Sequence, residues 1–269
     1  MGYGFFDYKY NIPDFDSDLF CTAHIVYIVL VYLLSFAVSY LLRRTRHERI
    51  TAMLKVQFVI MLLLETTKIS WESYYDITTG RGFNYFGLLP IYTCSLVMFT
   101  LPFAAWGRGR VKRAALAFLT TIGLLYGAIG VVYCNGLNFY PFWTFGAFYS
   151  LYFHSAMFFT GVFLLMTGYH KLEWGDALRA MAPILLLSLV AIPVNYSIGS
   201  DYMLIYSAGG VPLYEDLASR LAEMGLRPVF TAIMLLTHIP LAGVVIAVFK
   251  LIRAAFTKRG AKSAGGACA

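Results

Sequence analysis

The sequence predicts an all-α polytopic membrane protein with about seven transmembrane helices. The chain of 269 residues is 59% hydrophobic and only 13% charged, and its mean hydropathy is +0.69. A soluble domain carries about 25% charged residues, so this composition excludes an ordinary water-soluble fold. The apolar residues form long runs, and a helix of about 20 such residues crosses the hydrocarbon core of a bilayer.

Seven apolar runs follow one another along the chain, at residues 20–42, 50–70, 87–106, 114–134, 148–168, 180–198 and 228–250. No internal repeat and no linker rich in proline or serine separates them. We therefore expect a single transmembrane helical domain over residues 1–269. It should begin with a short outer tail, 1–19, and end with a disordered cytoplasmic tail, 256–269, whose residues are small and polar.

Lysine and arginine residues indicate the orientation of this bundle. The larger group lies on one side, at Arg43, Arg44, Arg46, Arg49, Lys55, Arg108, Arg110, Lys112, Arg113, Lys171, Arg179, Lys250, Arg253, Lys258, Arg259 and Lys262. The other side holds Lys9, Lys68, Arg81, Arg220 and Arg227. By the positive-inside rule, the N-terminus is expected outside and the C-terminus in the cytoplasm of a plasma membrane. The net charge of +7 is thereby explained without a nucleic-acid partner.

The longest connection, 199–227, contains the segment YEDLASRLAEMGLR. Leu217, Leu221 and Met224 follow one another at i, i+4 and i+7, and Gly225 can end a helix. This pattern predicts a short amphipathic helix at the outer membrane interface.

Polar residues of separate runs gather at one depth. The third and fifth runs both enter from the outside, which places Cys94 and His154 roughly 10 Å into the bilayer at 1.5 Å per residue. Glu65, Lys68 and Glu72 lie at i, i+3 and i+7 near the outer end of the second run and share one face.

Other runs add polar side chains to this outer half: Asn195 in the sixth run, His24 in the first, and Thr237 and His238 in the seventh. Charged and polar groups at this depth are expensive if they face lipid. We therefore expect them to face a shared interior cavity.

A thiol and an imidazole at matched depth can form a nucleophile and its base. The imidazole of His154 can take the proton of Cys94, and the resulting thiolate can attack an ester carbonyl. A thiol buried without such a base is inert. Because the substrate must reach this depth, the sequence points to acyl transfer or ester cleavage on a lipid.

Each residue also has a structural interpretation, which the sequence leaves open. Membrane cysteines commonly serve as small apolar packing residues, and the charged ladder on the second run can be a set of paired charges. Asn195 can bond a carbonyl freed by Pro193, and His24 and His238 fit structural roles better than catalytic ones. Cys21 and Cys134 both lie at outer helix ends, so a disulfide between them is open as well.

Several segments resemble the bacterial YwaF-type family of integral membrane proteins. LLPIYTC is similar to the family's LPLHLC-type segment, and NYSIGSDYMLIYSAGGVPLYEDL is similar to its Asn-x(4)-Gly-x-Asn-Tyr-Met-x-Leu segment. ETTKISWE, upstream of both, and the His154 run fall in the expected order, and the resemblance covers roughly residues 50–245. Two positions depart from the pattern: Tyr92 stands where histidine is usual, and Asp201 where asparagine is usual.

The YwaF-type family is similar to a eukaryotic transmembrane acyltransferase that remodels ether phospholipids through a cysteine and a histidine about sixty positions later. The resemblance therefore implies a phospholipid or lysophospholipid acyltransferase with Cys94 as the thioester-forming nucleophile and His154 as general base and then acid. Glu65, Lys68, Tyr92, Asn195 and His238 are candidates for binding the substrate. The expected partners are membrane phospholipids and lysophospholipids.

Two other classes of function compete with catalysis. One is a membrane protein that binds or transports a small polar solute or a lipid, although inverted repeats and glycine-broken helix pairs are missing from the sequence. The other is a seven-helix receptor; a retinal protein is disfavoured because the last run has no central lysine. The sequence shows no metal-ligand spacing and no nucleotide-binding loop, so no metal and no cofactor are expected.

Overall fold

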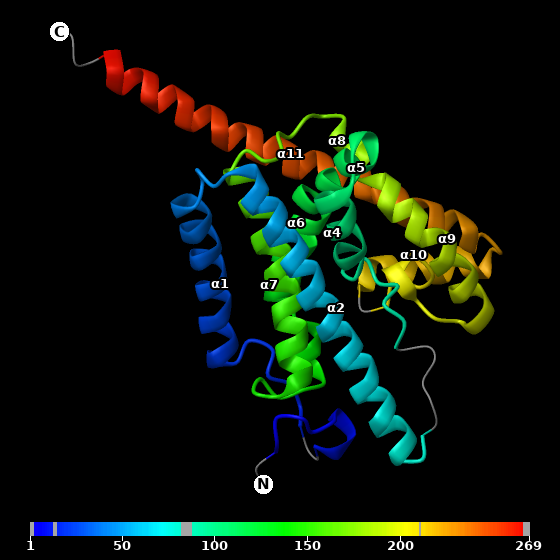
Figure 1. Ribbon diagram of the computed structural model, residues 1–269. Helices are drawn as coiled ribbons and strands as arrows, with labels where there is room; N and C mark the ends of the chain where they lie inside the picture. Colours follow the sequence, from blue (N-terminus) through cyan, green and yellow to red (C-terminus); the bar gives the residue numbers. More distant parts are fainter. Residues whose placement is uncertain (1–2, 13–14, 82–87, 210, 266–269) are drawn as a thin grey trace.

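The computed structural model describes residues 3–12, 15–81, 88–209 and 211–265 (Figure 1). Among these residues all regular elements are helical. Six segments are long and apolar enough to cross a membrane: Thr22–Leu41, His47–Thr78, Gly109–Asn138, Phe145–Met166, Asp176–Ile198 and Arg227–Ala254. The apolar helix Leu96–Trp106 is shorter. The expectation of an all-α polytopic membrane protein is confirmed, and the third predicted run differs from the rest.

One group of packed helices is built around α7 (Phe145–Met166), against which α1 (Thr22–Leu41), α2 (His47–Thr78) and α6 (Ile122–Val132) all pack (Figure 1). Buried polar bonds tie the helices together. The amide of Gln57 on α2 donates to the carbonyl oxygen of Ala156 at 3.2 Å and accepts from the Thr160 hydroxyl at 2.7 Å. Such satisfied polar bonds between helices fix their register inside a membrane.

A glycine sets the close approach of α6 to α7. A Cβ atom at Gly127 would lie 2.5 Å from the backbone nitrogen of Phe158. Backbone cannot retreat as a side chain can, so a larger residue here would push the two helices apart. Small residues at such crossings are typical of membrane helix packing.

The fourth predicted run is interrupted by a kink between α5 (Gly109–Thr120) and α6. Thr121 takes φ −122° and ψ −89°, outside the helical region. The hydroxyls of Thr120 and Thr121 donate back to the carbonyls of Leu116 at 2.7 Å and Ala117 at 2.6 Å. Hydroxyl groups bonded to the preceding turn commonly bend helices. The run then closes with a 3-10 turn, η2 (Asn135–Asn138).

The third predicted run is interrupted before its second half. The helix α4 covers Leu96–Trp106, whereas residues 89–95 lie outside any helix and form a bend and a turn at 92–95. Pro90 has no N–H to donate and disfavours helical backbone at the preceding residue, which explains why α4 does not extend back through residue 89. The expectation of a continuous helix over 87–106 was therefore wrong for its first half.

The remaining elements are α8 (Asp176–Arg179), α9 (Met181–Ile198), η3 (Tyr202–Leu204), α10 (Pro212–Glu223) and α11 (Arg227–Gly265). The helix expected in the connection 199–227 is confirmed as α10, and Gly225 after its end takes φ +71°. Helix α11 continues into the tail that we expected to be disordered. Its sequence there contains several alanines and lysines, which are good helix formers.

The N-terminal tail packs on the end of the bundle where α2 finishes. Tyr8, beside η1 (Lys9–Asn11), is only 3% exposed. Its ring stacks on Tyr75 at 5.3 Å between centroids, and its hydroxyl donates to Asp76 at 3.2 Å. Trp71 donates from its indole to the carbonyl of Phe6 at 2.9 Å. This end of the bundle is therefore closed by aromatic packing.

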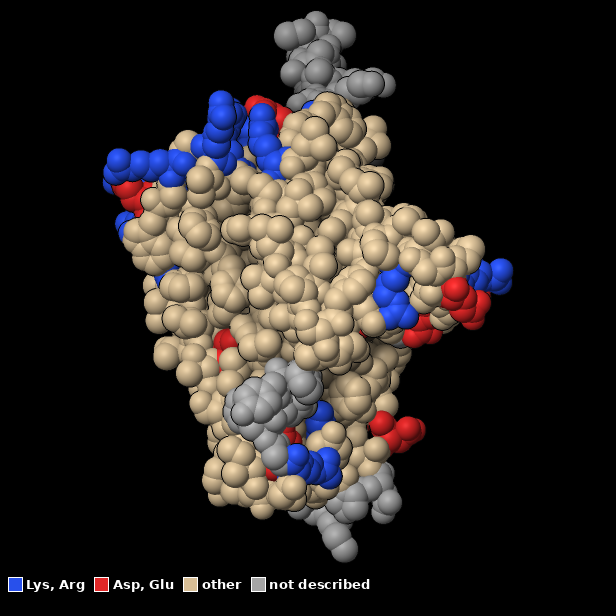
Figure 2. Space-filling view, turned by 90° about the vertical axis from the view of Figure 1, so that its right-hand side faces the viewer, with Lys and Arg blue, Asp and Glu red and all other residues tan. Residues whose placement is uncertain are grey.

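The outer faces of the helices are apolar, as lipid contact requires. Leu33 on α1 and Leu63 on α2, for example, are exposed large side chains. Figure 2 shows a broad uncharged surface with Lys and Arg side chains gathered toward the upper end of the molecule. At that end α2 and α5 begin (Figure 1).

Candidate functional site

Cys94 lies in the first turn that leads into α4. The backbone N–H of Leu96 donates to the carbonyl of Tyr92 at 3.3 Å, and that of Val97 donates to the carbonyl of Cys94 at 3.2 Å. Within the described residues, no hydrogen bond is donated by the backbone N–H of Thr93 or Ser95. The thiol therefore sits at a helix start, where free N–H groups and the helix dipole favour negative charge.

This segment is irregular and yet mostly buried. Ile91, Thr93 and Ser95 are each less than a tenth exposed, and Cys94 packs against the main hydrophobic core. Non-helical backbone at membrane depth is tolerated only where protein or a water-filled cavity surrounds it. The break in the third run thus places Cys94 inside the protein.

Two tyrosines lie close to the thiol. Tyr126 on α6 and Tyr149 on α7 pack against the same core as Cys94, and both are within electrostatic range of its sulfur. The hydroxyl of Tyr149 donates to the carboxylate of Glu65, which is buried on α2. Lys68, one turn further along α2, lies 5.8 Å from the centre of the Tyr149 ring.

Tyr126 is bonded in turn to His238 on α11. The Nδ1 atom of His238 faces the carbonyls of Met234 at 3.0 Å and Leu235 at 3.1 Å. Carbonyl oxygens only accept, so Nδ1 carries the proton and Nε2 has the lone pair. The Tyr126 hydroxyl therefore donates to Nε2 over 3.0 Å.

His154 is fixed on α7 by the same kind of bond. Its Nδ1 atom lies 2.8 Å from the carbonyl oxygen of Ser150 and must carry the proton. The Nε2 lone pair is then available as a base. The ring fills the space left by Gly130 on α6, because a Cβ there would lie 2.0 Å from Cδ2 and 2.6 Å from Nε2 of His154.

The described residues show no hydrogen bond between Cys94 and His154. Both nevertheless border the same stretch of α6. Tyr126, near the thiol, and Gly130, against the imidazole, lie at i and i+4 on one side of that helix. The dyad itself stays a prediction.

The other expected substrate-binding residues divide between two places. Lys68 forms an ion pair with Glu72 at 3.2 Å. This agrees with the structural interpretation of Glu65, Lys68 and Glu72 as a set of paired charges. Tyr92 is 42% exposed, and its ring lies 4.9 Å from that of Tyr202 between centroids. Tyr92 and Lys68 are thus the more accessible members of the set.

Asn195 is fully buried, and its amide is used within the protein. It donates to the carbonyl of Tyr202 at 2.9 Å and accepts from the N–H of Tyr202 at 2.8 Å and from the Ser200 hydroxyl at 2.9 Å. These bonds hold the loop after α9, rather than a carbonyl freed by Pro193. His24 is likewise engaged, through Val131 and Phe20.

The two cysteines considered for a disulfide are free thiols in the structure. Cys21 caps α1 by accepting the N–H of His24 at 3.5 Å. Cys134 is buried and donates to the Ser150 hydroxyl at 3.2 Å. Each thiol therefore has its own local contact.

The described residues contain no group of three or more His, Cys, Asp or Glu side chains that could hold a metal ion. The polar groups that share a core with Cys94 instead include two tyrosines that sequence reasoning missed. The chain has 20 tyrosines, and no spacing separates Tyr126 and Tyr149 from those that pack in aromatic clusters. Only the packing of α6 and α7 identifies them.

Comparison with known proteins supports the membrane assignment and adds a family. No curated protein and no solved structure matches the chain. The model of the TMEM164 family matches residues 19–249, which include every helix from α1 through most of α11 and all of the site residues above. The chain belongs to the TMEM164 family.

Proposed function

We propose that this protein is a membrane-embedded acyltransferase that takes an acyl chain from a phospholipid as a thioester on Cys94 and passes it to a lysophospholipid. The observation that carries the proposal is the buried break before α4. It places a thiol at a helix start, with unused backbone N–H groups beside it and apolar protein around it. A packing cysteine needs none of these features.

In the first step, the Cys94 proton moves to Nε2 of His154 as the sulfur attacks the ester carbonyl carbon. The carbon–sulfur bond forms, the ester carbon–oxygen bond breaks, and the departing lysophospholipid hydroxyl takes the proton from His154. The second step runs the same sequence in reverse, with the hydroxyl of a different lysophospholipid as the nucleophile. One imidazole serves as base and then acid in each step.

The start of α4 supports this chemistry electrostatically. The oxygen of the tetrahedral intermediate carries negative charge, and free N–H groups such as those of Thr93 and Ser95 are suitable donors for it. His154 carries its proton on Nδ1, so Nε2 is in the form that a base requires. For proton transfer, Nε2 has to approach the sulfur to within about 3 Å, a contact that commonly tightens only when substrate binds.

Nε2 of His154 has to move toward the sulfur, and two hydrogen-bonded tyrosines restrict the movement of the side chains around the thiol. Tyr149 is held by Glu65 and Tyr126 by His238, so the walls beside the thiol are fixed by helices α2 and α11. Lys68, beside the Tyr149 ring, and the exposed ring of Tyr92 are proposed to contact the lipid headgroup at the edge of the site. The site is proposed to lie in the outer half of the bilayer.

The test is chemical. Purified protein incubated with a phospholipid labelled in its acyl chain should retain label, and neutral hydroxylamine should remove it, since thioesters react with this reagent and amides do not. Cys94→Ser should lower turnover sharply because a serine hydroxyl is far harder to deprotonate than a thiol. His154→Ala should slow turnover by about 100-fold or more, the usual contribution of a general acid–base residue.

Cys21→Ser and Cys268→Ser are the matched controls, and both should keep the label. Equal labelling of a Cys94→Ala protein would refute the nucleophile assignment. If none of the common phospholipids or lysophospholipids labels the protein or is turned over, a binding or transport protein becomes the better interpretation.

A further inference from the structure

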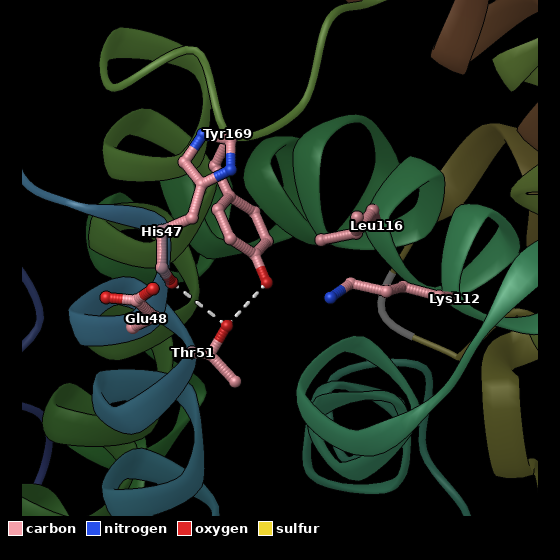
Figure 3. Close-up of a pocket in the computed structure, with 6 residues that line it drawn as sticks. All are labelled: His47, Glu48, Thr51, Lys112, Leu116 and Tyr169. Carbon is pink, nitrogen blue, oxygen red and sulfur yellow. Dashed lines mark hydrogen bonds between the residues drawn. The ribbon is translucent and has the colours of Figure 1, made fainter.

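A cavity of about 280 Å³ lies between the start of α2, the first turns of α5 and the turn after α7 (Figure 3). It is lined by His47, Glu48, Thr51, Lys112, Leu116 and Tyr169. Thr51 and Glu65 are fourteen positions apart on α2, or about 21 Å at 1.5 Å per residue. The cavity is therefore separate from the Cys94 site.

This cavity contains one lysine, Lys112. No ion pair among the described residues includes Lys112, whereas its neighbour Arg113 pairs with Glu173 at 3.9 Å. The Nζ atom of Lys112 lies 5.2 Å from the centre of the Tyr169 ring. Figure 3 shows this atom pointing into the cavity, toward the hydroxyls of Tyr169 and Thr51.

One wall of the cavity is fixed by a chain of hydrogen bonds. The Thr51 hydroxyl donates to the carbonyl of His47 at 3.0 Å, so the Tyr169 hydroxyl donates to Thr51 at 2.8 Å. The His47 and Tyr169 rings meet edge to face at 5.1 Å. In Figure 3 the Glu48 carboxylate lies on the other side of Thr51 from Lys112, and it leaves the ammonium free for a ligand.

The start of α2 provides a second attraction for an anion. Its N-cap residue, Arg46, makes no side-chain cap. Within the described part of the chain, the backbone N–H groups of His47 and Glu48 donate no hydrogen bond. Exposed arginines, Arg43 and Arg44 among them, flank this end of the helix. A helix start and a free lysine that meet at one cavity are a suitable arrangement for a phosphate group.

We propose that this cavity binds the phosphate of an anionic phospholipid headgroup from the leaflet at the basic end of the bundle. The volume is just below the range of sites for drug-sized ligands, so it accommodates a headgroup and leaves the acyl chains in the bilayer. Lys112 pairs with the phosphate, and the imidazole of His47 provides a further donor. The surrounding arginines raise the local concentration of anionic lipid.

The test uses the full-length protein in a neutral detergent. It is titrated with phosphatidylglycerol labelled in an acyl chain, and with phosphatidylcholine carrying the same label as the neutral reference. The protein should bind phosphatidylglycerol more tightly. Lys112→Met should weaken that binding by about tenfold, the loss expected for one charge-assisted hydrogen bond. It should weaken phosphatidylcholine binding much less, because the choline cation offsets the charge of that lipid's phosphate. Lys112→Arg should retain the preference.

Arg110→Met is the matched control, because it removes the same charge from the same helix, at an exposed position outside the cavity. It should change phosphatidylglycerol binding by less than about twofold, as expected for a screened surface charge. An equal loss in Lys112→Met and Arg110→Met would mean diffuse surface attraction and would overturn the site. Glycerol phosphate should compete only weakly; inorganic phosphate that displaces the lipid at equal concentration would identify a free anion as the ligand instead.

Discussion

Replacing Gly130 by alanine tests whether His154 must be held where the structure places it. The new Cβ would lie 2.0 Å from Cδ2 of His154, whereas ordinary contact begins at 3.4 Å. The imidazole therefore has to retreat by about 1.4 Å, the difference between these two distances. Because the ring is tethered through Nδ1 to the carbonyl of Ser150 at 2.8 Å, this retreat strains or breaks that hydrogen bond.

The expected cost can be worked from these contacts. Overpacking a tight site costs about 1–3 kcal/mol, and the weakened hydrogen bond adds about 1 kcal/mol. Alanine is a better helix former than glycine, which offsets about 1 kcal/mol of this loss in stability. Gly130→Ala should thus lower the free energy of unfolding by about 2 kcal/mol, and it should slow acyl transfer because the displaced ring moves Nε2 from its position against α6.

The assay is thermal unfolding of the purified protein, together with turnover of labelled phospholipid at a temperature where both proteins are folded. Gly243→Ala on α11 is the control, since nothing lies within 4 Å of its Cβ position. It should unfold at the same temperature as the original protein or somewhat higher. If Gly130→Ala matches this control in both stability and turnover, His154 is not confined by α6 and the reasoning is refuted.

Two further changes probe the rest of the molecule. Burial lowers the pKa of His170 below the usual 6.5 despite its contact with Asp176 at 3.1 Å. The unfolded chain therefore binds the proton first, so stability should fall as pH decreases through 6.5, and His170→Gln should flatten this dependence in unfolding curves. Asn195→Ala removes three hydrogen bonds to the loop after α9. It should cost roughly 3 kcal/mol in the free energy of unfolding.

Local sequence determined the class of this protein and most of its helices. Apolar runs long enough to cross a bilayer can be read from the sequence, because lipid contact requires apolar side chains along the whole length of a helix. The helix α10 and its glycine stop were predictable for a related reason. Leu217, Leu221 and Gly225 follow a periodic pattern and a backbone preference that act within a few residues.

Tertiary structure alone decided how the polar groups meet. The order of residues along the predicted runs led us to expect Cys94 and His154 at one depth. Which partner each side chain faces depends on how the helices are rotated and packed, and the sequence contains no signal for that. The close crossing at Gly127 and Gly130 turns His154 against α6, and the break after Pro90 places Cys94 near Tyr126 and Tyr149.

Asn195 illustrates the same limit. Its position in a membrane span made it a candidate for substrate binding. In the structure its amide instead forms hydrogen bonds with the backbone of Tyr202, seven residues further along the chain. The cavity at Lys112 could not be predicted from the sequence either, because its walls come from α2, α5 and the turn after α7. Residues far apart in the chain become neighbours only when whole helices pack, and that packing depends on shape complementarity over many side chains rather than on any short pattern.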